Sequence, residues 1–163
     1  MPITNPIQIL SIEPSDAALI QSAAKIHWGD VLIVVHGSLY YLDHLPGFKA
    51  VQDGTMQGLV TYQIGEGLCE IVSLDSFIPR QGIGRSLVNA VIEIAQQAGC
   101  KKILLVTTND NLDAMAFYQK LGFQMVWVEP DAVTRSREIK PSIPMFAENG
   151  LPIRDEITFE LKI

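Results

Sequence analysis

Apolar and polar residues alternate at both ends of the chain, and this pattern predicts a strand at each end. The first alternating segment is residues 7–12 (IQILSI) and the last is residues 157–163 (ITFELKI). Between them, residues 48–64 are typical of a hairpin with Asp53-Gly54 at its turn. Residues 68–78 (LCEIVSLDSFI) are mostly apolar, which predicts a strand at the centre of a sheet.

Two segments with apolar residues three and four positions apart predict amphipathic helices. Residues 17–28 form the first, and Pro14-Ser15-Asp16 before them offers a side-chain cap. Residues 82–98 form the second, which ends at Gly99 and should bury one side: Ile83, Leu87, Val91, Ile94, Ala95 and Ala98. The pattern continues with a strand at 101–107, a helix at 111–121, a strand at 122–129 and a segment compatible with a helix at 131–140.

The connection between the central strand and the second helix, residues 74–85 (LDSFIPRQGIGR), carries the clearest chemical signal. Gly82 and Gly84 let the backbone approach a ligand closely, and the free N–H groups of the first helical turn favour an anion. Arg80 and Arg85 flank the turn and add positive charge. The turn predicts a phosphate site, although a tight connection without a ligand is compatible with the same residues.

Two common nucleotide-binding motifs do not fit this turn. A Walker loop needs a Gly-Lys pair, which the chain lacks. A dinucleotide fingerprint needs a third glycine where Leu87 stands, and an acidic residue about twenty positions further on, where the chain has Lys101 and Lys102. Both nucleotide interpretations become minor alternatives.

A second segment, residues 103–123 (ILLVTTNDNLDAMAFYQKLGF), combines an apolar strand, a polar break and a short helix. Asn111, Ala114 and Tyr118 lie three and four apart, so they share one helix face. Together with the glycine turn, this segment resembles the GNAT superfamily of N-acetyltransferases, which use acetyl-coenzyme A (acetyl-CoA). The family pattern N-x-x-A-x-x-[LF]-Y-x-x-x-G-F is met by Asn111, Ala114, Phe117, Tyr118, Gly122 and Phe123.

The family's pyrophosphate pattern, [QR]-x-x-G-x-[GA], is met in part. Gly82 and Gly84 match, but Pro79 stands where the family usually has Gln or Arg, and Arg80 where a glycine is common. Either Arg80 replaces the missing side chain from one position later, or backbone amides hold most of the pyrophosphate. The two motifs cover roughly residues 68–129.

The resemblance implies an α/β fold with a mixed, mostly antiparallel sheet and helices on both faces, in one N-acetyltransferase domain spanning residues 1–163. It also suggests a helix around residues 39–45. Residues 31–45 (VLIVVHGSLYYLDHL) therefore have two interpretations, because their first half is typical of a strand. We expect the proline-rich stretch 141–152 to be a loop over or beside the acceptor end of the cleft.

Composition narrows the class of protein. A chain of 163 residues suits one domain with a full core, and 48% hydrophobic against 18% charged residues argues against disorder. A formal net charge of −6 disfavours nucleic acid as a partner. An acidic surface suits an amine acceptor, but it is equally typical of an ordinary soluble protein.

No signal peptide or membrane span is predicted. Cys69 and Cys100 have neither CxxC nor metal-ligand spacing, which favours reduced thiols in the cytoplasm. No metal site is expected, because the three histidines lack the spacing of a ligand motif: His27, His36 and His44. A monomer and a homodimer are both compatible with the sequence.

By the resemblance, the strand that ends at Leu74 splays from the next parallel strand. Its free backbone groups then pair with the pantetheine arm and polarise the thioester carbonyl, while Asn111 contacts the arm or an ordered water. The cofactor-binding residues implied in this way are Leu74, Ser76, Arg80, Gln81, Gly82, Ile83, Gly84, Arg85, Asn111, Ala114 and Phe117.

Tyr118 corresponds to the family's general acid, which protonates the coenzyme A thiolate, with a packed core tyrosine as the alternative. Glu70 is the first candidate for the general base, since an apolar strand disfavours a charged carboxylate, although an ion pair near a strand end explains it equally well. Asp75, expected on the opposite face of the strand, is a second candidate, and a chain of waters is a third route.

The acceptor side is implied only by the family plan, in which N-terminal segments line the cleft. His27, Trp28, Tyr40 and Tyr41 are the candidates there, against ordinary packing. The predicted function is direct transfer of an acetyl group from acetyl-CoA to a primary amine of a small molecule or a peptide. The alternative is a non-catalytic acyl-CoA-binding sensor or interaction domain with the same fold.

Overall fold

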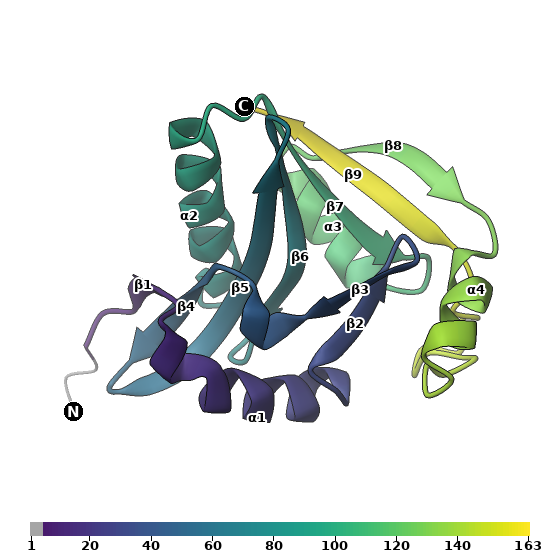
Figure 1. The fold of residues 1–163 in the computed structure, drawn as a ribbon, viewed down its shortest axis with the longest axis horizontal. Helices are drawn as coiled ribbons and strands as arrows, with labels where there is room; N and C mark the ends of the chain where they lie inside the picture. The colour runs from purple at the N-terminus through teal and green to yellow at the C-terminus, as the bar shows by residue number, and fades with distance from the viewer. Residues whose placement is uncertain (1–4) are drawn as a thin grey trace.

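The central feature of the fold is a seven-stranded sheet, which the computed structural model shows within residues 5–163, the part of the chain that it describes (Figure 1). Its strands, in spatial order, are β1 (Gln8–Ser11), β4 (Gly47–Gln52), β5 (Thr55–Gly65), β6 (Leu68–Ser76), β7 (Lys102–Thr108), β9 (Glu156–Lys162) and β8 (Gln124–Glu129). Only β6 and β7 pair in parallel. The predicted mixed, mostly antiparallel sheet with a central β6 is confirmed.

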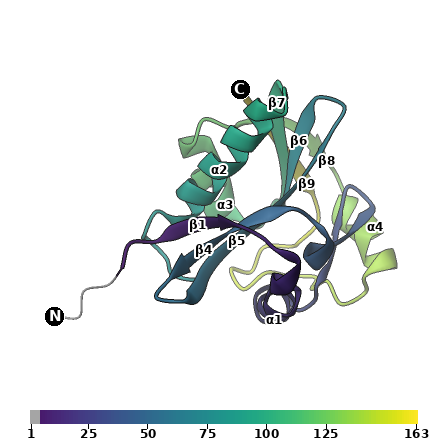
Figure 2. The ribbon, with the colours of Figure 1, turned by 60° about the vertical axis from the view of Figure 1, so that its left-hand side comes forward.

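Helices cover both faces of this sheet and enclose two apolar cores. The helices are α1 (Ala17–Trp28), α2 (Ile83–Gln97), α3 (Leu112–Lys120) and α4 (Ala132–Ile139). The larger core lies between the sheet and α2 and α3, and the smaller one joins α1 to the opposite face. Figure 2 shows α2 and α1 on opposite sides of the strands β1, β4 and β5. No helix of the described chain is long and apolar enough to cross a membrane.

Local sequence signals explain most of these elements. Asp53 and Gly54 both have positive φ (50° and 75°), the conformation that the predicted two-residue hairpin requires. Gly99, with φ of 79°, follows the end of α2 as expected. The predicted buried side of α2 is correct at Ile83, Leu87, Val91 and Ala95, but Val88 is buried instead of Ala98, which lies beyond the last helical residue and is exposed.

The expected helix at residues 39–45 is wrong. The chain there forms β2 (Leu32–Val35) and β3 (Ser38–Tyr41), a separate two-stranded sheet, followed by a single 3₁₀ turn at Leu42–His44. His36 and Gly37 have positive φ (50° and 71°), so the segment closes as a tight hairpin. The strand interpretation of its first half is confirmed.

The residues before α1 also differ from expectation. Pro14–Asp16 form a 3₁₀ turn, and no side chain caps the first helix. The Asp16 carboxylate instead accepts a hydrogen bond from the Glu13 N–H (2.8 Å) and pairs with Lys49 at 2.7 Å. The Lys49 ammonium is the main cause that holds the pKa of Asp16 below its ordinary value.

A β-bulge and a strand separation shape the middle of the sheet. Thr61 pairs with Ser73 and Tyr62 with Ile71, which leaves Val72 without a partner on β5. The parallel pairing of β6 with β7 ends at Ile71 and Leu105, so the two strands continue beyond this point without hydrogen bonds to each other. The predicted splay is therefore present, and its opening begins next to the bulge.

Candidate functional site

A cavity of about 570 Å³ lies where β6 and β7 separate, next to the first turn of α2. Both sequence motifs contribute to its wall, although about thirty residues of chain separate them. It is lined by Leu74, Asp75, Ser76, Pro79, Arg80, Gly82, Ile83, Gly84, Arg85, Asp113, Ala114, Phe117 and Tyr118. Nine of the eleven predicted cofactor-binding residues are in this wall, and the structure brings them together from β6, the turn before α2, α2 itself and α3.

The start of α2 has the geometry of an anion site. Gly82 adopts a left-handed conformation with φ of 72° at the N-cap, and the first helical hydrogen bond runs from the Ser86 N–H to the Gly82 carbonyl. The N–H groups of the three residues from Ile83 to Arg85 therefore have no partner within the helix, and the helix dipole adds positive potential there. Arg80 also has positive φ, 64°, at the position where the family commonly has glycine.

Gly84 allows α2 to approach α3 closely. A Cβ atom at this position would lie 3.1 Å from the Phe117 Cζ atom, which is tighter than ordinary van der Waals contact. The glycine turn and the Tyr118 segment are therefore packed closely against each other.

Tyr118 is buried on the side of α3 that faces the larger core. Its ring lies 5.2 Å from Phe117 and 5.6 Å from Phe123 between ring centroids, both in edge contact. Among residues 5–163 its hydroxyl forms no hydrogen bond, and burial alone raises its pKa. Tyr118 is consequently a protonated phenol that lines the cavity with an unused donor.

Two carboxylates line this cavity, Asp113 of α3 and Asp75 of β6, and Asp75 is the one at the strand separation. Its Oδ2 atom lies 3.4 Å from Nδ1 of His27 on α1, and the His27 ring stacks on Phe77 with centroids 4.1 Å apart. Burial raises the pKa of Asp75, and the nearby His27 partly opposes the shift. At the strand separation, Asp75 is thus in contact both with the cavity and with His27 of α1.

The expected position of Asp75 on the face opposite Glu70 is wrong, and the bulge is the reason. Glu70 pairs with Gln63 and Asp75 pairs with Leu59, and these two β5 residues lie four positions apart on one face. Because Val72 is an extra residue in β6, the alternation of side chains shifts by one between Glu70 and Asp75. Both carboxylates therefore face the side of the sheet that α1 covers.

Glu70 itself lies outside the wall of this cavity, in the part of β6 that still pairs with β7. Its Oε2 atom accepts hydrogen bonds from Gln63 (2.9 Å) and from the Tyr40 hydroxyl (3.5 Å). Of the other predicted acceptor residues, Trp28 packs against the smaller core and Tyr41 is exposed. His27 is next to the cavity because it contacts Asp75, which lines it. Tyr40 is hydrogen-bonded to Glu70, outside the wall of the cavity.

The two remaining cofactor candidates, Gln81 and Asn111, also lie outside the wall of the cavity. Gln81 is exposed in the turn before α2, and Asn111 is the N-cap of α3, where its side chain accepts a hydrogen bond from the Ala114 N–H at 3.3 Å. The cap explains why this family position favours a short polar side chain. Contact between Asn111 and the pantetheine arm stays a prediction.

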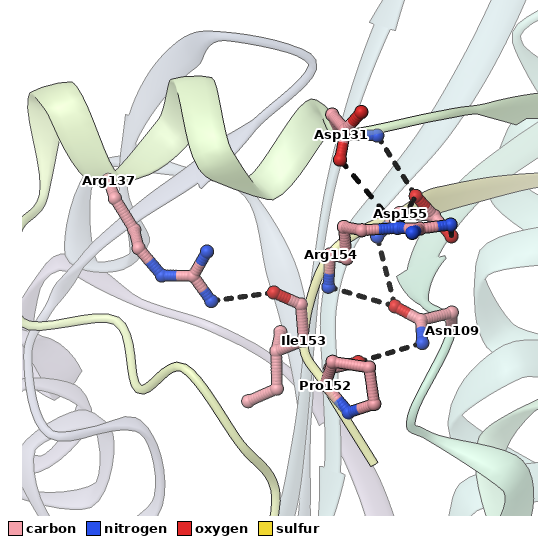
Figure 3. Close-up of polar contacts among 7 residues, drawn as sticks. All are labelled: Asn109, Asp131, Arg137, Pro152, Ile153, Arg154 and Asp155. Carbon is pink, nitrogen blue, oxygen red and sulfur yellow. Dashed lines mark hydrogen bonds and ion pairs between the residues drawn. The ribbon is translucent and has the colours of Figure 1, made fainter.

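The C-terminal loop is held in place by residues that sequence reasoning did not single out. We call residues 141–155 the strap. Arg137 of α4 donates hydrogen bonds to the carbonyl oxygens of Ile143 (3.2 Å), Pro144 (2.6 Å) and Ile153 (2.6 Å). Asn109, at the end of β7, accepts the N–H groups of Arg154 and Asp155 at 2.9 Å and donates to the Pro152 carbonyl at 2.8 Å (Figure 3).

The strap closes a second cavity of about 240 Å³ on the face of the sheet that carries the β2–β3 hairpin. Its walls come from β2, β7, α4, β9 and the strap, and the β7 part is Val106–Thr108, beyond the last pair with β6. Residues 141–152 therefore form the expected loop, and its position beside the acceptor end of the cleft stays a prediction. The polar break Thr107–Asn111 was the available signal, since short polar residues at a strand end commonly hold neighbouring backbone.

Comparisons with known proteins place these features in a family. Residues 20–123 match the model of the acetyltransferase (GNAT) family. The uncharacterised protein YdhI of Bacillus subtilis is 48% identical over 134 residues, which is 82% of this chain and 84% of that protein.

Solved structures of acetyltransferases share the fold. An acetyltransferase from Bacillus subtilis in complex with CoA superposes with a TM-score of 0.70 at 21% identity, covering 97% of this chain and 99% of that one. A GNAT acetyltransferase from Elizabethkingia anophelis with acetyl-CoA bound gives 0.69 at 22% identity, covering 96% and 98%. The family match spans both motifs and the strand separation between them, and the chain belongs to the GNAT acetyltransferase family.

Proposed function

We propose that this protein transfers an acetyl group from acetyl-CoA directly to a primary amine of a small molecule or a peptide. One observation carries the proposal. The glycine turn of α2, the unpaired end of β6 and Tyr118 of α3 line a single cavity. A phosphate site, a backbone edge and a proton donor are thereby brought to one place.

The residues of this cavity fit acetyl-CoA, the ligand of related GNAT structures. The free N–H groups at the start of α2, with Arg80 and Arg85, suit the pyrophosphate. The backbone of Leu74–Ser76, unpaired towards β7, is free to bond the pantetheine amides. When bound, acetyl-CoA supplies an activated acetyl group as a thioester, and holding it beside the amine supplies about 7–11 kcal/mol of the barrier reduction.

Asp75 takes the part of the general base in this proposal, with Glu70 as the alternative from the sequence. Asp75 lines the cavity, and burial raises its pKa above the ordinary value, which makes the carboxylate a stronger base. The backbone N–H groups near Leu74 polarise the acetyl carbonyl. Tyr118 donates its proton to the departing thiolate, and its raised pKa keeps that proton in place beforehand.

A cytoplasmic location is part of the same proposal. Cys69 and Cys100 are free, buried thiols, and burial raises the pKa of Cys69 to about 12. A pair of unbonded thiols suits a reducing compartment. Acetyl-CoA as donor fits that location as well.

The test is release of free coenzyme A thiol from acetyl-CoA against a panel of amines, with coenzyme A affinity measured separately by titration calorimetry. Amine-dependent thiol release is expected. Tight coenzyme A binding without release for any amine of the panel would instead support a non-catalytic acyl-CoA-binding domain. Absence of coenzyme A binding would contradict both.

A further inference from the structure

The second cavity, bounded by β2, β7, α4, β9 and the strap, has a mainly aliphatic wall with three hydroxyl side chains, Thr107, Thr108 and Ser136, and one carboxylate. Its aliphatic wall is made by Val34, Val35, Val106, Val133, Ile143 and Ile153. Within the described chain, Glu156 at the start of β9 is the one ionisable residue in this wall. A cavity of about 240 Å³ equals the share of about eight water molecules, which suits an aliphatic arm of a few carbon atoms.

Glu156 is buried and its charge is only partly matched. Its side chain is 5% exposed, and its Oε2 atom accepts the His36 N–H at 3.2 Å and lies 3.6 Å from His36 Nδ1. Its Oε1 atom forms no hydrogen bond within residues 5–163. The nearby Arg135 is engaged with Glu129, the residue opposite Glu156 on β8. Burial raises the pKa of Glu156, with Glu129 adding to the shift and His36 and Arg135 opposing it.

The position of Glu156 relates this cavity to the transfer site. Glu156 pairs with Thr108, at the end of the β7 segment that has left β6. Asp75 lies on the corresponding unpaired segment of β6. The half-buried Asp75 and the buried Glu156 therefore stand on opposite borders of the same strand separation, and of these two only Asp75 lines the cavity that contains Tyr118.

We propose that the second cavity binds the distal end of the acceptor and that Glu156 anchors a second positive charge there, so that the acceptor is an aliphatic amine with two cationic groups. This inference rests on the proposed function, because it places the reacting amine at Asp75. A distal ammonium group completes the unused hydrogen bonding of the buried Glu156 carboxylate, where a charge-assisted bond is strong. The aliphatic spacer fills the valine and isoleucine wall.

The experiment compares α,ω-diaminoalkanes with linear monoalkylamines of equal chain length. Binding to the protein saturated with coenzyme A is measured by calorimetry, and acetyl transfer is measured separately. The native protein should bind a diamine of fitting length about 10- to 100-fold more tightly than its monoamine counterpart. Glu156→Gln keeps the shape and one acceptor oxygen but should abolish this preference, with coenzyme A affinity unchanged.

Glu160→Gln is the matched control, because Glu160 lies on the same strand and pairs with Lys102 outside the cavity. It should keep the preference for diamines. Val34→Phe, which fills the cavity from the hairpin, provides a second variant if Glu156→Gln fails to fold, and it should weaken diamine binding while coenzyme A binding persists. Native circular dichroism is required for both variants.

Equal binding of diamines and monoamines by the native protein would overturn the inference. So would an equal loss of both ligands in Glu156→Gln, since Glu156 would then hold the reacting ammonium. Diamine binding that depends on Glu156, without acetylation of any amine, would support the cavity and contradict the proposed function instead.

Discussion

Two side chains, Tyr118 and Asp75, carry most of the proposed chemistry, and the surroundings of each side chain shift its pKa. Tyr118 is a protonated phenol at neutral pH, and its burial among aromatic rings raises its pKa further above the ordinary value of 10.0. Asp75 is held at a strand separation, where burial disfavours its charge and His27 favours it. A proton donor and a proton acceptor thus line the same cavity. Tyr118 must be protonated before the reaction, whereas Asp75 must be ionised.

Tyr118→Phe tests the donor. The ring contacts with Phe117 and Phe123 persist in the variant, and no hydrogen bond is lost, so stability and coenzyme A affinity should hardly change. The chemical step in single-turnover measurements should slow by roughly 10²–10⁴. A wild-type chemical step, with an acceptor that the native protein acetylates, would remove Tyr118 from the mechanism.

Asp75→Asn tests the acceptor of the proton. The base works only when ionised, so kcat/KM of the native protein should rise with pH through the pKa of Asp75, which burial raises above its ordinary 3.8. In the variant, kcat/KM should no longer increase with pH in this way. Its rate of acetyl transfer should be lower than that of the native protein by a factor of roughly 10²–10⁴. Glu70→Gln is the matched control and should keep the pH dependence. If Glu70→Gln loses it and Asp75→Asn does not, Glu70 is the base.

His27→Phe refines the same test. The substitution preserves an aromatic ring over Phe77 but removes the group that lowers the pKa of Asp75. The pKa of Asp75 should then rise further, and the acidic limb of the pH–rate profile should move to higher pH. An unmoved limb would mean that Asp75 does not govern it.

At the scale of elements, the strap depends on one helix. Three carbonyl groups of the strap accept hydrogen bonds from the single guanidinium of Arg137 on α4, and Asn109 of the β7 end holds three further backbone groups. Lys140, just past the end of α4, donates to the Leu32 carbonyl of β2 at 2.8 Å. The segments that form the wall of the second cavity are therefore linked by hydrogen bonds between side chains and backbone groups.

Arg137→Lys should loosen the strap without unfolding the protein. Lysine keeps the charge but cannot present the planar fork that reaches several carbonyls at once, and each lost hydrogen bond costs about 1–3 kcal/mol locally. Acceptor KM should rise while coenzyme A affinity stays constant, and chymotrypsin should cut faster after the exposed Phe146. Arg135→Lys, on the same helix, is the control. Unchanged proteolysis and KM would show that the other contacts of the strap, among them those of Asn109 and Asn149, hold it without the Arg137 fork.

At the scale of the whole molecule, the two cores share their strands. Side chains of β5 and β6 point alternately into the core under α2 and the core under α1, and the sheet continues through β7 and β9 to β8. Both cores use strands of the same seven-stranded sheet, although the β2–β3 hairpin also packs on the smaller core, and one domain over residues 1–163 stays a prediction. Such a protein should unfold in a single cooperative transition.

The two tryptophans report on this prediction from distant places. Trp28 packs against the smaller core, and Trp127 is 63% exposed on the edge strand β8. Trp28→Phe and Trp127→Phe leave one fluorescent probe each. Urea unfolding followed by either probe and by circular dichroism should give the same midpoint, after correction for the change in stability that each substitution causes. Midpoints that differ between probes within one variant would indicate two independently folding units.

Sequence alone determined the features that depend on neighbours along the chain. The turn residues Asp53-Gly54 and the end of α2 at Gly99 follow from backbone conformations that particular residues favour. The central position of β6 follows from its apolar composition, because a strand covered on both faces needs few polar residues. The glycine turn and the Tyr118 motif could also be identified from the sequence, since each lies within one short segment.

Only the tertiary structure decided how distant segments meet. The bulge at Val72 arises from register against β5, and it brought Asp75 to the face of α1 and to His27, 48 residues earlier in the chain. The burial of Glu156 depends on a hairpin, a helix and a strap that meet around it. Register and burial are set by partners that a local pattern does not contain, and for this reason the acceptor side was the part that periodicity and motifs left open.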